Sequence, residues 1–130
     1  AKFCVLAIPY LVELFQQDSN WLVRYSILAA IDLRQHPEIL LELSVLGLRG
    51  DDPVVREIAL ASLGELVKTP QEDLALELLL LAAKSEEGEI RTQVARVLRN
   101  FEDPRAQFAL VNLRQDSDYR VVGATLEGLI

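Results

Sequence analysis

Residues 51–64 read DDPVVREIALASLG, the composition of a short amphipathic helix with small residues that allow close packing. The two aspartates offer oxygens for the free amides of a helix N-terminus, and Pro53 suits the first helical position because its φ is already fixed. Apolar residues then recur three and four residues apart, at Val55, Ile58, Ala59 and Leu63. This spacing predicts a helix that begins near Pro53.

A short motif similar to the start of this segment occurs at three other places in the chain. The four motifs are NWLVR from Asn20, DPVVR from Asp52, EGEIR from Glu87 and DYRVV from Asp118. Alignment of Val23, Val55, Ile90 and Val121 places successive repeats 32, 35 and 31 residues apart. A period in the low thirties built from helix pairs is typical of an α-solenoid, in which stacked repeats share one core. We therefore predict an all-α superhelix of about four helix pairs, with repeats near 1–34, 35–68, 69–101 and 102–130.

The positions of proline and of helix-capping residues also predict eight short helices joined by short turns. Proline precedes an apolar run at positions 37, 53, 70 and 104, and no two-residue alternation lasts long enough to indicate a sheet. Side chains that can cap a helix precede three of the second helices, at Asp18–Asn20, Asp51–Asp52 and Asp116–Asp118.

Composition limits the classes of function. The 130 residues are 51% hydrophobic but only 6% aromatic, and 20 acidic residues against 13 basic ones give a net charge of −7. Nucleic acid and anionic membrane surfaces are disfavoured as partners, because both are bound mainly through Lys and Arg. No apolar run approaches the roughly 20 residues of a membrane helix, so we expect a cytoplasmic protein. The absence of Met and the helical register at Leu129 and Ile130 fit a fragment of a longer array.

Cys4 and His36 are the only cysteine and histidine of the chain. One of each excludes an internal disulfide and a Cys/His zinc site. His36 has no partner for a nucleophile–base pair, and Cys4 is expected to be an inert core thiol. Neighbouring acids at helix starts are expected to cap amides rather than to transfer protons. We therefore expect no catalytic residue, no metal, no cofactor and no enzymatic activity.

Residues 51–64 resemble the second-helix motif of HEAT repeats, in the short bacterial type often called phycobilisome-lyase-like. The segments AIPYL from Ala7 and DPRAQFAL from Asp103 are similar to the first helices of that type. The resemblance covers essentially all 130 residues as four repeats. It implies a HEAT-like solenoid, and the phycobilisome-lyase-like type implies a chromophore-handling role as an alternative function.

Arginine occupies an equivalent position in the first turn of three second helices, at Arg24, Arg56 and Arg91. The family pattern implies that these side chains reach carboxylates or carbonyls in the turns of adjacent repeats. In the last repeat Val122 takes the arginine position and Arg120 stands two residues earlier. We call this series of arginines and their partners the ladder. Partly exposed ion pairs contribute about 0–1 kcal/mol each, so we expect the ladder to affect the angle between stacked repeats more than the stability of the fold. The acidic members of the expected ladder are Asp51, Asp52, Asp116 and Asp118.

Two groups of residues are candidates for binding a partner. The first stands at the opening of one helix and has the Trp–Tyr–Arg composition of a binding hot spot. It comprises Trp21, Arg24 and Tyr25, and the alternative is that Trp21 packs over the turn of its own repeat. The second lies on the polar side of the second helix of the third repeat and comprises Gln93, Arg96 and Asn100.

The run from Leu74 to Ala83 is apolar on nearly every side. A first helix in the middle of a solenoid touches both neighbours, which accounts for a wide apolar stripe; the alternative is a surface for a dimer or a docked partner. Charge is also uneven, since Glu65–Glu89 carries a net −5 and Arg91–Arg120 a net +2. Helix faces that carry salt bridges account for this uneven charge. The alternative is a basic patch that binds an acidic partner or the carboxylates of a ligand.

These patterns predict a non-catalytic scaffold module that binds another protein through the concave surface of the solenoid. One alternative is a bilin lyase/isomerase-like or phycobilisome-associated subunit, in which the Arg91–Arg120 segment would meet the propionates of a bilin. A second is a DNA-binding HEAT-like repair protein, which the net charge of −7 disfavours. A third is a purely structural segment of a longer scaffold.

Overall fold

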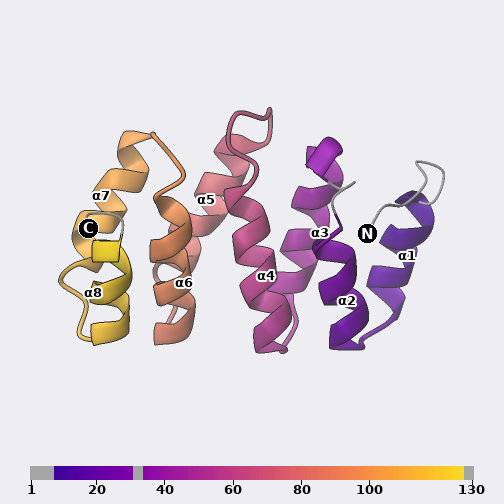
Figure 1. Ribbon diagram of the computed structural model, residues 1–130, viewed down its shortest axis with the longest axis horizontal. Helices are drawn as coiled ribbons and strands as arrows, with labels where there is room; N and C mark the ends of the chain where they lie inside the picture. The colour runs from indigo at the N-terminus through magenta and orange to yellow at the C-terminus, as the bar shows by residue number, and fades with distance from the viewer. Residues whose placement is uncertain (1–7, 31–33, 128–130) are drawn as a thin grey trace.

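The computed structural model describes residues 8–30 and 34–127, and these ranges contain eight helices and no strand. Figure 1 shows the helix pairs side by side in chain order across the molecule, which confirms the predicted α-solenoid of about four pairs. In these ranges no helix has both the length and the apolar character needed to traverse a bilayer. The helices are α1 (Ile8–Gln17), α2 (Trp21–Leu28), α3 (Pro37–Arg49), α4 (Pro53–Gly64), α5 (Glu72–Ala82), α6 (Gly88–Leu98), α7 (Pro104–Leu113) and α8 (Tyr119–Leu126).

Local chemistry sets the helix starts. Proline is the first residue of α3, α4 and α7, whereas Pro70 lies in the turn before α5, which begins at Glu72. The predicted caps of α2, α4 and α8 are confirmed, and α7 is capped in the same way. Side chains that accept hydrogen bonds from backbone amides at these starts are Asn20, Asp52, Asp103 and Asp118.

Each second helix packs against the next second helix, so α2, α4, α6 and α8 form a continuous row. The first helices contact one another less, and α3 and α5 hardly touch. The row of second helices is therefore the more closely packed of the two rows. We call its solvent-facing surface the inner face. Its exposed side chains include Trp21, Leu22, Tyr25, Val54, Glu57, Glu89, Arg96, Tyr119, Arg120 and Leu126.

The core runs between the two rows of helices and is built from Leu, Ala, Val and Phe. Four hydroxyl side chains are buried within it, and each donates a hydrogen bond to a carbonyl three or four residues earlier in its own helix. Their hydrogen-bonding needs are therefore met without a partner on another helix. They are Ser44, Ser62, Thr92 and Thr125.

Small residues let neighbouring helices approach closely. A Cβ atom added at Gly47 would lie 3.2 Å from the Ala59 Cβ, where α3 meets α4. A Cβ added at Gly64 would lie only 2.5 Å from the Val97 Cγ1, where α4 meets α6. Contact between repeats therefore depends on the missing side chain at Gly64.

We expect Gly64→Ala to lower the free energy of unfolding by about 1–3 kcal/mol, because overpacking outweighs the better helix propensity of Ala. Gly123→Ala is the matched control: it lies inside α8 with nothing within 4 Å of the added Cβ. There Ala should stabilise the protein by about 0.5–1 kcal/mol. Urea unfolding measures the free energy of unfolding of both variants. Equal stabilities of Gly64→Ala and Gly123→Ala would show that the α4–α6 contact does not need glycine.

Candidate functional site

The repeat register places corresponding residues of the second helices on the inner face. The aligned residues Val23, Val55, Ile90 and Val121 are each the third residue of their helix. The residue before each of them is exposed in all four helices, at Leu22, Val54, Glu89 and Arg120. At this one position the inner face is apolar on α2 and α4 and charged on α6 and α8.

Trp21 and Tyr25 lie one helical turn apart on α2 and leave 47% and 37% of their surfaces exposed. The adjacent Leu22 is 55% exposed. Three large apolar side chains are therefore in contact with solvent at one end of the inner face. Such a cluster is more common at contact sites than on surfaces that face only water.

Arg24 does not join this cluster. Its guanidinium lies 5.2 Å from the centre of the Phe15 ring, and its Nε donates a hydrogen bond of 2.8 Å to the Asp18 carbonyl. A cation above an aromatic face and a bond to the turn hold this side chain against its own repeat. The structure thus separates Arg24 from Trp21 and Tyr25, its neighbours in the predicted group.

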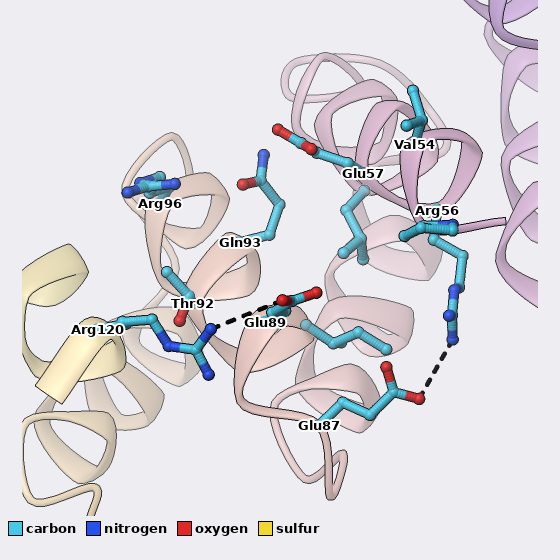
Figure 2. A pocket seen from close by; sticks show the side chains of 12 residues that line it. Val54, Arg56, Glu57, Glu87, Glu89, Thr92, Gln93, Arg96 and Arg120 are labelled. Atoms are coloured by element: carbon cyan, nitrogen blue, oxygen red, sulfur yellow. Dashed lines mark hydrogen bonds and ion pairs between the residues drawn. The ribbon is translucent and has the colours of Figure 1, made fainter. Parts of the chain in front are cut away.

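A groove of about 420 Å³ lies between α4 and α6 on the inner face. Figure 2 shows Glu57 reaching from α4 toward α6, and Gln93 and Arg96 on the opposite wall. Leu60 and Ile90 are among the apolar residues that line it. The groove therefore combines an apolar lining with charged and amide side chains from two repeats.

The second predicted group is divided. Gln93 and Arg96 line the groove, and Arg96 Nε also donates to Glu127 at 3.2 Å. Asn100 was predicted on the same helix, but α6 ends at Leu98 and Asn100 lies in the following turn, beside a different cavity. The helix ends early because Asn100 and Phe101 turn back through bonds to carbonyls three residues before them.

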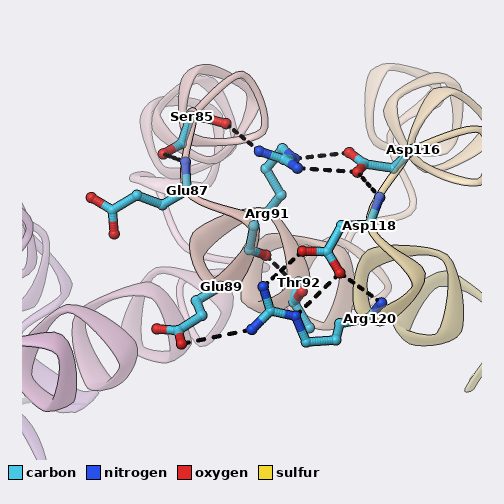
Figure 3. A network of polar contacts seen from close by, with 9 residues as sticks. Ser85, Glu87, Glu89, Arg91, Thr92, Asp116, Asp118 and Arg120 are labelled. Carbon is cyan, nitrogen blue, oxygen red and sulfur yellow. Dashed lines mark hydrogen bonds and ion pairs between the residues drawn. The ribbon is translucent and has the colours of Figure 1, made fainter.

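Arg91 connects the third repeat to the fourth. Its guanidinium donates two hydrogen bonds to the Asp116 carboxylate, of 2.8 Å and 3.1 Å, and a third of 2.8 Å to the Ser85 carbonyl. The Arg91 and Asp116 side chains are only 17% and 12% exposed. Figure 3 shows this network between the turns that precede α6 and α8. A bidentate pair of this kind fixes the orientation of two repeats.

Arg24 and Arg56 make some of the contacts that Arg91 makes. Arg56 Nη1 lies 3.3 Å from the Glu87 carboxylate in the next repeat, and its Nη2 donates to the Asp51 carbonyl at 3.3 Å. The bond from Arg24 to Asp18 is of the same kind, to a carbonyl in the turn before its own helix. Each arginine thus binds its own turn, while Arg56 and Arg91 also reach a carboxylate of the next repeat.

The expected acids of the ladder have several different roles. Asp51 contributes its backbone carbonyl and Asp52 caps α4, so neither carboxylate is drawn into a pair with Arg56. Asp118 caps α8 and binds Arg120 Nη2 at 2.7 Å. Gly88 leaves room for this pair, since a Cβ there would collide with the Asp118 carboxylate. Glu87, which pairs with Arg56, was not among the expected acids, although it stands three residues before Ile90, just as Asp52 and Asp118 stand three residues before Val55 and Val121.

The ion pairs shift the acidity of the carboxyls. Hydrogen bonds from Arg91 hold the pKa of Asp116 below its ordinary value of 3.8, and the amide of Asp118 adds to the effect. Hydrogen bonds from the Arg120 side chain and amide lower the pKa of Asp118 to about 2. Both carboxyls therefore remain ionised well into the acid range.

The Leu74–Ala83 run is partly core and partly surface. Ala75, Leu76 and Leu79 are buried, whereas Leu74 and Leu81 are 53% and 66% exposed. On α7, Phe108 and Val111 are 70% and 50% exposed, and an apolar groove of about 640 Å³ lies between α5 and α7. We call the exposed residues Leu74 and Leu81 of α5 and Phe108 and Val111 of α7 the outer patch, and of these Phe108 lines the groove. The two α7 residues were not predicted from the sequence, although they are three residues apart.

The remaining predicted residues form no further site. His36 is half-buried at the start of α3, and its side chain makes no capping hydrogen bond. Cys4 and the final residues Leu129 and Ile130 lie outside the described residues. Within residues 8–30 and 34–127, no cluster of three or more His, Cys, Asp or Glu side chains is arranged to hold a metal.

Asp116→Asn keeps the shape of the side chain and removes its charge, so we expect a loss of about 1–3 kcal/mol in the free energy of unfolding near neutral pH. The folded-state pKa of Asp116 is lowered, so its contribution is present above pH 3.8 and is lost as pH falls through the folded-state value. The variant should therefore lose less stability on acidification than the wild type. Urea unfolding at neutral and acid pH measures this.

Glu89→Gln is the control for the loss of an exposed acidic side chain, because Glu89 is 74% exposed and 3.7 Å from Arg120. We expect it to change neither the stability nor its pH dependence appreciably. Equal acid sensitivity of Asp116→Asn and the wild type would contradict a role for the Arg91–Asp116 pair.

Comparison with known proteins places this geometry in a family. Comparison with curated proteins gives no match. The family model described as HEAT repeats matches residues 42–130, which contain most of α3 and all of α4 to α8. The match covers more than half of the chain, and the paired helices and their stacking agree with it. The chain belongs to the HEAT-repeat family.

Proposed function

We propose that this protein is a non-catalytic scaffold module that binds another protein along its inner face. HEAT repeats commonly mediate protein–protein interaction. The observation that carries the proposal is the exposure of Trp21 and Tyr25, at 47% and 37%, on the row of second helices. Aromatic side chains of this kind dominate the binding energy of many interfaces.

The contacts that hold the second helices together also support this function. Second helices are held by core packing and by the Arg56 and Arg91 bonds between repeats. A preformed surface loses little conformational entropy when a partner docks. The groove between α4 and α6 continues the same surface, so a partner can contact three repeats at once.

The arginines of the Arg91–Arg120 segment give less support to a chromophore-handling role. Five of them already pair with carboxylates, and these are Arg91, Arg96, Arg99, Arg105 and Arg120. The propionates of a bilin would have to displace those partners. The same pairing, with the net charge of −7, weighs against a DNA-binding function.

Selection of short random peptides by phage display on the immobilised protein tests the proposal. We expect the selected peptides to lose at least about tenfold in affinity for Trp21→Ala/Tyr25→Ala, because both truncations remove apolar contact area. Tyr10→Ala is the matched control, since Tyr10 is a 68% exposed aromatic residue on the first helix α1. Melting curves establish that all variants are folded. Unchanged affinity for the folded double variant would contradict binding at this part of the inner face.

We also propose that the outer patch joins two copies of the chain. The exposure of Leu81 and Phe108, at 66% and 70%, supports this, because burial of such surface favours association. Phe108 also lines the apolar groove between α5 and α7. The patch lies on α5 and α7, so a dimer would leave the inner face free.

For this dimer we expect the mass measured by light scattering to rise with concentration toward that of two chains. Leu81→Glu should remain a monomer over the same range, because association would bury an unpaired charge. Leu22→Glu places the same charge on the inner face, where Leu22 is 55% exposed, and should dimerise as the wild type does. A concentration-independent monomer mass for the wild type would exclude the dimer.

A further inference from the structure

The inner face changes its chemistry along its length. At the α2 end, Trp21, Leu22 and Tyr25 present apolar surface, and Val54 on α4 continues it at 41% exposure. Beyond Val54 the face becomes the groove between α4 and α6. The two parts meet at Val54, so one extended segment of a partner can lie across both.

The apolar part of the groove suits the stem of a long side chain. Val54, Leu60 and Ile90 line it, with Leu60 buried and Ile90 half-buried. Lysine and arginine pack their methylene stems on apolar surface and keep the charged group in contact with water or a carboxylate. The groove offers both environments within one cavity.

The cations of the groove already have partners. Arg96 donates to Glu127 at 3.2 Å, Arg120 to Asp118 at 2.7 Å, and Arg56 lies 3.3 Å from Glu87. Glu127 and Asp118 do not line the cavity, so two of its three arginines are neutralised from outside it.

Two carboxylates of the groove are more loosely held. Glu57 makes no ion pair with any residue in 8–30 or 34–127, and Glu89 has only a 3.7 Å contact with Arg120. Glu89 is also 74% exposed, and Figure 2 shows its carboxylate between the two helices that form the groove. The groove is lined by three arginines and three glutamates, and Glu127 and Asp118 each pair with one of these arginines from outside the lining. Glu127 is also 3.9 Å from Arg99. The two loosely held carboxylates, Glu57 and Glu89, therefore offer a local site for a positive charge.

We propose that the partner segment on the inner face carries a lysine or arginine that binds between Glu57 and Glu89, and an apolar side chain that packs on Trp21, Leu22 and Tyr25. This inference rests on the proposed function and names the chemistry of its partner. Packed helices are about 8–10 Å apart, so α2 is roughly 14 Å from the middle of the groove. An extended chain covers that distance in about four residues. The partner segment is thus a basic, extended peptide with an apolar anchor about four residues from its cation.

The test uses the peptides selected by phage display on the wild-type protein. We expect the enriched sequences to share a Lys or Arg about four residues from a Leu, Phe, Ile or Trp. Their affinity should fall about tenfold or more for Glu57→Lys/Glu89→Lys, because charge repulsion replaces attraction at the cation. It should also fall with added salt, since the contact is partly exposed.

Two further variants separate charge from folding. Glu57→Gln/Glu89→Gln preserves shape and should weaken the same peptides by a smaller factor. Glu77→Lys changes an exposed acid on α5, away from the inner face, and should leave affinity unchanged. Circular dichroism verifies that each variant is helical.

The outcomes distinguish this inference from the proposed function. Enriched peptides without a cation, or with affinities unaffected by Glu57→Lys/Glu89→Lys in a folded protein, overturn the inference. If such peptides still lose affinity for Trp21→Ala/Tyr25→Ala, the proposed function stands with a different partner chemistry. Peptides indifferent to both sets of variants overturn both, and a selection that enriches nothing overturns the basic-peptide inference.

Discussion

Close packing of each second helix on the next one is the contact on which the rest of the structure depends. A single helix pair cannot bury both of its apolar faces, so every repeat requires its neighbours. Gly64 shows how little space separates adjacent second helices, since a methyl group there would lie 2.5 Å from a side-chain atom of Val97. The same row of helices forms the inner face, so the packing that stabilises the fold also positions the candidate site.

The polar bonds between repeats act on this packed row in a different way. The Arg91–Asp116 pair is mostly buried and bidentate, whereas the Arg56–Glu87 pair leaves Glu87 56% exposed. Geometry and desolvation make the first pair the stronger constraint on orientation. The third and fourth repeats are therefore fixed to one another by a stronger polar contact than the second and third, and their second helices also make the most extensive contact of the row.

Much of the fold could be predicted because its signals are local. The N-cap chemistry of Asn20, Asp52 and Asp118 and the repeat of an apolar pattern each depend on a few adjacent residues, and both predictions are confirmed. The candidate site was less predictable. Arg24 belongs to the same sequence group as Trp21, but its guanidinium turns to Phe15 and Asp18, a choice made by residues outside the group.

By itself, the sequence determined the helix pairs, their period and the residues that face the core, because helical spacing and capping depend on residues that are close together in the chain. Only the tertiary structure decided which exposed residues share a surface. Glu57 and Glu89 are 32 residues apart in the chain and become opposite walls of one groove because α4 and α6 stack. The physical reason is that stacking sets distances between repeats, and no single repeat contains that information.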